Sequence, residues 1–156
     1  MSVTNEHKGL YLSEMEHDAC GIGFVAHLKG EKSHRIIRDA LTMLENMEHR
    51  GACGCEENTG DGAGILMQIP HDYYANEVKK MGVELPALGK YGTGFIFFPQ
   101  DETKRNECKV FIEQTAKKLK FTILGYRKIN TDNSPIGPTA KSGEPSIEQL
   151  FIKPEF

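Results

Sequence analysis

The spacing of apolar residues predicts three helices in this chain. Between Ser33 and Glu48, apolar residues recur at spacings of one, three and four and line one helix face: Ile36, Ile37, Ala40, Leu41, Leu44 and Met47. A short helix is expected over 71–81, with one apolar side formed by Tyr74, Val78 and Met81. A third helix is expected after Asp101, a suitable N-cap, with an apolar stripe of Cys108, Phe111, Ile112, Thr115 and Leu119.

Apolar runs bounded by glycine and proline predict five strands, over 20–28, 64–70, 91–98, 121–129 and, at the end of the chain, 147–152. A last strand with no partner in its own chain would leave an exposed sheet edge. We therefore interpret the end at Phe156 as a truncation. The connection over 130–145 is rich in turn residues, and local rules do not predict its conformation.

Composition narrows the class of protein. With 156 residues and 38% hydrophobic content, the chain can bury a sizeable core. The formal net charge is -3, and no run of like charge is typical of a nucleic-acid or membrane partner. Residues 1–19 lack the apolar core of a secretory signal, and no apolar run approaches the ~18 residues of a membrane span. The sequence predicts a cytoplasmic protein.

The four cysteines, at positions 20, 53, 55 and 108, match neither a secreted disulfide framework nor a CxxC metal pair. Cys53 and Cys55 are too close together for the usual zinc knuckle, so we predict no metal site. A redox or metal role for this pair would require a reversible disulfide or bound metal. Cys108 lies on a predicted apolar stripe and is expected to be a buried structural thiol.

Cys20 has two interpretations. It opens an apolar run after a polar leader, and removal of residues 1–19 would give it both a thiol and a free α-amino group. A thiol with a pKa of about 8.5 needs a base at neutral pH, and an α-amino group with a pKa of about 8 can serve on the same residue. Alternatively, Cys20 is a small buried residue at the start of a strand.

The region after the first helix is also open to two interpretations. Gly51 fits a left-handed helix C-cap, and Arg50 complements the negative helix end. The glycine-rich loop over 52–64, which includes Asp61 and Gly62, either cradles a ligand through its backbone amides or forms a tight connection. It lacks a phosphate-binding fingerprint, so we predict no nucleotide there.

Several ordered segments carry a family resemblance: DACGIGF, EHRGACG, TGDGAGILMQIP, YGTGFIFFPQ, NSPIGPTA and EPSIEQLFI, which begin at residues 18, 48, 59, 91, 133 and 144. Together they resemble the N-terminal class II glutamine amidotransferase domain of glutamate synthase large subunits, which are N-terminal-nucleophile hydrolases. The resemblance implies an α+β fold, a four-layer αββα sandwich that is incomplete in this chain.

The resemblance also implies a processed enzyme. Residues 1–19 would be a propeptide, and 20–156 the N-terminal part of the amidotransferase domain. Cys20 would be the nucleophile that hydrolyses L-glutamine to glutamate and ammonia, for reductive transfer to 2-oxoglutarate. Arg50 and Gly51 would support the site, with the helix-end role of Arg50 as the alternative, and Asp61 and Gly62 would shape the turn beside it.

The family motifs for the oxyanion hole and for holding the glutamine backbone occur further downstream and are absent here. Because loss of an oxyanion donor costs about 100- to 1000-fold in rate, the isolated chain is expected to be inactive. No cofactor is expected in this chain; FMN and an iron-sulfur cluster are implied for the complete enzyme. Implied partners are the remainder of the large subunit and an electron-donating small subunit or ferredoxin. The alternative is a non-catalytic remnant or split-gene module that pairs with a partner chain.

Overall fold

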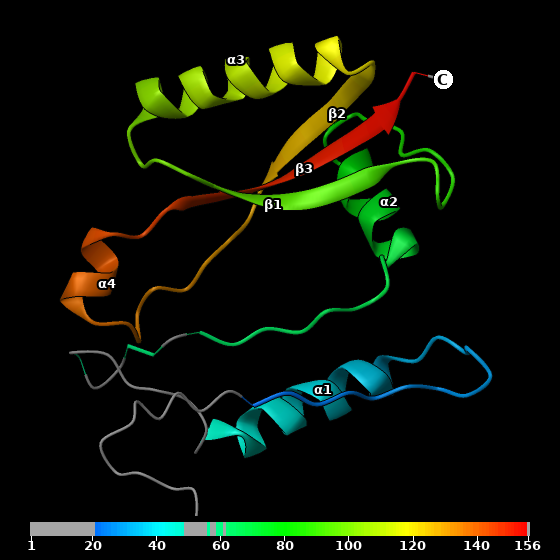
Figure 1. Ribbon diagram of the computed structural model, residues 1–156, viewed down its shortest axis with the longest axis vertical. Coiled ribbons are helices and arrows are strands. Elements are labelled where there is room, and N and C mark those ends of the chain that lie inside the picture. Colours follow the sequence, from blue (N-terminus) through cyan, green and yellow to red (C-terminus); the bar gives the residue numbers. More distant parts are fainter. Residues whose placement is uncertain (1–20, 49–55, 57–58, 61, 156) are drawn as a thin grey trace, which may run out of the picture. The chain divides into compact units, whose positions relative to one another are not determined.

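The computed structural model of the protein describes residues 21–48, 56, 59–60 and 62–155 (Figure 1). The chain divides into two compact units, Met1–Met67 and Gln68–Phe156. The first unit contains helix α1 (His34–Asn46), and the second contains three helices and three strands.

Helix α1 confirms the helix predicted between Ser33 and Glu48. The Ser33 hydroxyl accepts a hydrogen bond from the Arg35 amide at 3.2 Å and caps the first turn. At the other end, the Met47 amide closes the last turn by donating to the carbonyls of Met43 and Leu44. The cap residue is therefore Met47, and the expectation that Gly51 caps this helix is wrong because the helix closes four residues earlier.

Strands were predicted over 20–28 and 64–70. Both predictions are wrong, because the described residues of these segments form no regular strand. Ile22 is 96% exposed, Phe24 90% and Leu66 103%. An apolar run becomes a strand only when a neighbouring strand pairs with its backbone. In the described residues these two segments have no such ladder, so their side chains stay exposed.

The second unit is built on an antiparallel sheet with the strand order β1-β3-β2. The strands are β1 (Gly92–Phe98), β2 (Phe121–Lys128) and β3 (Ser146–Pro154), which confirms the strands predicted over 91–98, 121–129 and 147–152. Strand β3 pairs with β1 on one side and with β2 on the other. The last strand is therefore central in the sheet, and the expectation that it lacks a partner in its own chain is wrong.

Two helices cover opposite faces of this sheet (Figure 1). Helix α2 (His71–Lys79) packs on the face that carries Phe151, where Tyr74, Val78, Tyr91 and Phe151 form the buried core. The Tyr74 and Phe151 rings meet edge to face with centroids 5.5 Å apart. On the other face, α3 (Glu102–Lys118) runs along the sheet, and its Lys109 is paired with Glu148 of β3 at 2.7 Å.

Helix α3 confirms Asp101 as an N-cap, because its Oδ1 accepts a hydrogen bond from the Lys104 amide at 2.8 Å. The predicted apolar stripe is only half right. Cys108 and Ile112 are half-buried, and Ala116 is buried on the same side. Phe111 and Leu119, by contrast, are 70% and 60% exposed. Thr115 is exposed as well and bonds back to the helix through the Phe111 carbonyl.

The connection over 130–145 contains a short helix, α4 (Pro138–Ser142), that begins with its proline. Glu144 holds the preceding loop, since its carboxylate accepts hydrogen bonds from Asn133 at 2.8 Å and from Thr131 at 3.3 Å. Helices together with an antiparallel sheet agree with the expected α+β class. One multi-stranded sheet is present in the described residues, so the four-layer αββα sandwich stays a prediction.

Candidate functional site

The predicted site falls mostly outside the residues that the structure describes. Cys20, Arg50, Gly51 and Asp61 all lie outside them, as do Cys53 and Cys55, so their distances from one another stay untested. Gly62 is the one described member of the set. Its φ of +97° is in the region that glycine adopts readily and other residues rarely do. Position 62 therefore requires glycine for the backbone turn itself.

The segment that follows Cys20 lies against helix α1. A Cβ atom placed on Gly23 would collide with the thioether sulfur of Met43, a half-buried residue of α1. Glycine at position 23 thus allows a close approach between this backbone and the helix. Helix α1 thereby positions the chain three residues beyond the predicted nucleophile.

Two hydrogen bonds join Glu56 to Thr59 in the loop before Gly62. The Thr59 amide donates to the Glu56 carbonyl at 3.1 Å, and the Thr59 hydroxyl donates to the Glu56 carboxylate at 3.1 Å. These two bonds hold the chain just before the TGDGAG motif that starts at Thr59. Both interpretations of the loop over 52–64 stay hypotheses, because 52–55, 57–58 and 61 lie outside the described residues.

Within the described ranges, no group of three or more histidine, cysteine or acidic side chains is arranged to hold a metal ion. Cys108 is a free, half-buried thiol on α3, close to its expected structural role. Among the same residues, no helix is long and apolar enough to cross a membrane.

The sequence analysis missed a buried polar network in the second unit. Arg127 of β2 donates from Nε and Nη2 to Oε1 of Gln149, at 3.0 and 2.7 Å. Gln149 is 1% exposed, and its Nε2 donates to the hydroxyl of Thr93 at 3.0 Å. The Arg127 guanidinium also reaches the carboxylate of Glu77 on α2 at 3.4 Å. The network joins all three strands to α2, and its signal in the sequence was a polar residue within each strand pattern.

A second cluster lies under α3. Lys109 pairs with the largely buried carboxylate of Glu148, and its ammonium lies 4.8 Å from the ring centre of Tyr126 and 5.5 Å from that of Phe98. Burial raises the pKa of the Tyr126 hydroxyl, and the nearby carboxylates of Glu113 and Glu148 raise it further. The first cluster binds α2 to the sheet, and the second binds α3 to it. Neither cluster contains a predicted site residue.

A family comparison identifies the chain. The family model of class II glutamine amidotransferases matches residues 20–156. The chain belongs to this family. The matched region begins at Cys20.

Relatives of this amidotransferase chain are glutamate synthases. It is 42% identical over 160 residues to an NADH glutamate synthase of Saccharomyces cerevisiae, which covers 99% of this chain and 7% of the relative. It is 41% identical over 145 residues to the large chain of an NADPH glutamate synthase of Bacillus subtilis, covering 93% of this chain and 9% of the relative. A ferredoxin-dependent glutamate synthase of Synechocystis is 35% identical over 137 residues, with coverage of 88% and 9%.

The amidotransferase chain thus spans under a tenth of the length of these relatives.

Proposed function

We propose that this chain forms part of the glutaminase half of a glutamate synthase, with Cys20 as an N-terminal nucleophile. The observation that carries the proposal is the family match, which covers 20–156 and begins at Cys20 itself. A boundary at this residue fits a chain whose mature form starts with the cysteine. Residues 1–19 would then be a propeptide that is cut away.

The chemistry follows from the two groups that cleavage would place on one residue. The α-amino group takes the thiol proton, and the thiolate attacks the side-chain amide carbon of L-glutamine. As the carbon-nitrogen bond breaks, the proton passes to the leaving nitrogen and ammonia departs. Water then cleaves the γ-glutamyl thioester, which gives glutamate and restores the thiol.

Arg50, Gly51, Asp61 and Gly62 are proposed to support this site. The positive φ of Gly62 fits its role in shaping the turn that follows Asp61. Arg50 is proposed as a cation near the substrate. Its alternative role at a helix end has less support, because α1 ends at Asn46.

The complete reaction is assigned to the longer protein, because the chain spans only 7–9% of the relatives named above. There, ammonia would be transferred reductively to 2-oxoglutarate. FMN and an iron-sulfur cluster would belong to parts beyond this chain, and an electron-donating small subunit or ferredoxin would supply electrons. The four-layer αββα sandwich, inactivity of the isolated chain and a cytoplasmic location are further parts of the proposal.

The test uses the glutamate synthase that contains this segment. Mass spectrometry of its large subunit should find Cys20 as the first residue. Replacement of Cys20 by alanine should abolish glutamine-dependent synthesis and leave ammonia-dependent synthesis unchanged, because only the ammonia source is lost. The matched control is Cys108→Ala, since Cys108 is a half-buried thiol on α3 and should not affect glutamine use. Retained glutamine use by the Cys20→Ala enzyme would contradict the assignment.

The alternative is a non-catalytic module that pairs with a partner chain. An intact Met1 with no cleavage before Cys20 would favour it, because Cys20 would then lack its α-amino base. The same mass measurement therefore separates the two functions.

A further inference from the structure

The backbone that follows Cys20 meets helix α1 at Gly23. A Cβ atom placed on this glycine would collide with Sδ of Met43 and would lie 3.1 Å from its Cγ and 3.3 Å from its Cε. The φ angle of Gly23 is outside the left-handed region, so alanine could adopt the same backbone conformation. Glycine is therefore needed at position 23 for space, because the Met43 thioether fills the volume that a side chain would take.

Met43 belongs to a helix that is tied to this segment by a turn. The His27 carbonyl accepts a hydrogen bond from the Gly30 amide at 2.9 Å, and Nδ1 of His27 accepts one from the Glu31 amide at 3.2 Å. These two bonds close the turn that leads into α1. The chain reverses there, so α1 runs back along the segment and brings Met43, a half-buried residue, to Gly23 (Figure 1).

This contact matters because of the chain end that the proposed cleavage would create. As the first residue, Cys20 would be held covalently only by the residues that follow it, and three residues of chain span at most about 11 Å. Two of those residues are Gly21 and Gly23, which restrict the backbone less than other residues do. Ile22 is 96% exposed, so its side chain does not hold the segment. The contact of Gly23 with Met43 therefore limits where the Cys20 thiol can lie.

We propose that Gly23 and Met43 are positioning residues that hold the Cys20 thiol in line with the glutamine amide. This role rests on the function proposed above, because it requires Cys20 to be the nucleophile. A thiolate must lie about 3–3.5 Å from the carbon that it attacks, and a displacement of about 1 Å can cost about 100-fold in rate. A methyl group at position 23 must separate from Met43 to the ~3.5–4 Å of an ordinary contact. Because Met43 is half-buried, part of that separation must come from the backbone that carries Cys20.

The test measures glutamine-dependent and ammonia-dependent synthesis by the glutamate synthase that contains this segment. Gly23→Ala should lower kcat with glutamine about 100-fold, and Met43→Ala about 10-fold, because the second change removes the support without adding a collision. The double variant should match Met43→Ala and thus exceed Gly23→Ala about 10-fold, since the Met43→Ala change removes the three crowding atoms. Ammonia-dependent synthesis should be unchanged in all three.

A second readout separates positioning from a general loss of structure. Iodoacetamide alkylates an accessible thiolate without a bound orientation, so the rate at which it alkylates Cys20 should be the same in wild type and in Gly23→Ala. Mass spectrometry follows this alkylation and should find Cys20 as the first residue of every variant. Slower alkylation, or a Gly23→Ala chain that keeps residues 1–19, would overturn the proposal, because misfolding or failed cleavage would then explain the lost rate.

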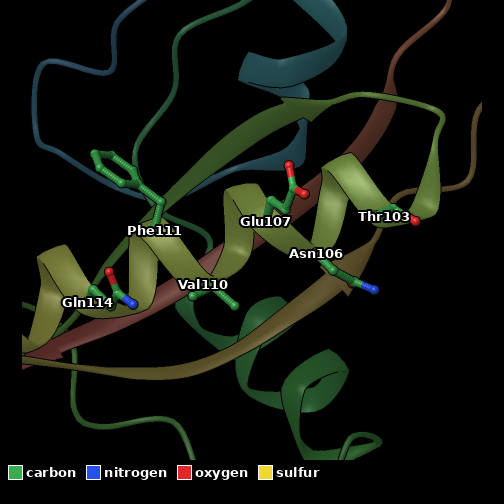
Figure 2. A pocket seen from close by; sticks show the side chains of 6 residues that line it. All are labelled: Thr103, Asn106, Glu107, Val110, Phe111 and Gln114. Carbon is green, nitrogen blue, oxygen red and sulfur yellow. The ribbon is translucent and has the colours of Figure 1, made fainter.

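Two matched controls lie in the second unit. Gly125→Ala also adds a methyl group beside a methionine, but the nearest atom is the terminal Cε of Met81 at 3.2 Å, which a flexible side chain can withdraw. Val110→Ala also shortens an apolar side chain of a helix, and Val110 is 50% exposed where it lines an open hollow on α3 (Figure 2). Both variants should keep kcat with glutamine within about 2-fold of wild type.

Cys20→Ala separates a failure of this proposal from a failure of the proposed function. If Cys20→Ala abolishes glutamine use and Gly23→Ala keeps the full rate, the nucleophile stands and the positioning role is overturned. A double variant slower than Gly23→Ala, or a control that loses as much rate as Gly23→Ala, would also overturn the positioning role. Retained glutamine use by Cys20→Ala would overturn both, because there would then be no nucleophilic thiol to position.

Discussion

The buried amide of Gln149 should contribute strongly to the stability of the second unit. Gln149 is 1% exposed and accepts two hydrogen bonds from the guanidinium of Arg127, whose side chain is 19% exposed. Replacement by methionine keeps the length of the side chain and removes both polar atoms. The guanidinium then loses its acceptor, and the Thr93 hydroxyl loses the amide that donates to it.

The expected loss can be estimated from these contacts. Hydrogen bonds to a charged group contribute about 1.5–3 kcal/mol, and the two bonds to Gln149 share one acceptor oxygen. Thr93 still donates to the Leu150 carbonyl at 2.8 Å, so it adds little to the cost. We expect Gln149→Met to lower the free energy of unfolding by about 2 kcal/mol. In urea this corresponds to a midpoint about 1 M lower, for an ordinary denaturant dependence.

The assay is urea unfolding followed by circular dichroism for Gln149→Met, Arg127→Met and the double variant. Because both single changes break the same bonds, the double variant should lose about 2 kcal/mol less than their sum. Gln100→Met, an exposed glutamine in the turn before α3, is the matched control and should change stability by less than about 0.5 kcal/mol. Additive losses at Arg127 and Gln149 would refute the reasoning.

Three further predictions concern α2, α3 and β2. Asp101→Ala should destabilise the chain by about 1 kcal/mol in thermal unfolding, with Asp101→Ser as the rescuing control, because the cap of α3 is lost. Tyr126→Phe should leave stability unchanged or raise it by about 1 kcal/mol, since its buried hydroxyl has no partner in the described residues; a large loss would contradict this. The hydrogen bond from Lys80, aided by the charges of Lys80 and Arg127, lowers the pKa of Glu77 below 4.5. The Glu77 carboxylate therefore stabilises the fold above pH 4.5, and this stabilisation is lost as the pH falls through its lowered pKa. The difference in unfolding free energy between wild type and Glu77→Gln should vanish in acid. A difference that stays constant with pH would contradict the prediction.

Local signals in the sequence predicted local structure well. Ser33 and Asp101 both cap the helices that they were expected to start, because a cap depends on a side chain and an amide two or three residues away. Strands β1 and β2 also lie within a residue or so of the predicted ranges. Each is an apolar run closed by a turn signal and paired with β3, whereas the run over 64–70 has the same signal and forms no strand.

Features that depend on distant partners could not be predicted in this way. The apolar residues of α3 fit more than one buried side, and only the position of the sheet selects Ala116 over Phe111. The central place of β3 depends on β1, more than 40 residues earlier in the chain. As a polar residue in a strand, Gln149 would be predicted to face solvent. Its burial is favourable because its amide oxygen accepts a hydrogen bond from the guanidinium of Arg127 on the neighbouring strand.

The candidate site differs again, because its decisive feature is a covalent state rather than a contact. With Ala19 attached, the nitrogen of Cys20 belongs to a peptide bond and cannot take a proton from the thiol at neutral pH. If that bond were cut, the same nitrogen would become an amine with a pKa of about 8, close to that of a cysteine thiol. The close approach of Gly23 to Met43 cannot substitute for this change. The identity of the first residue of the mature chain therefore decides between a nucleophile and a structural thiol.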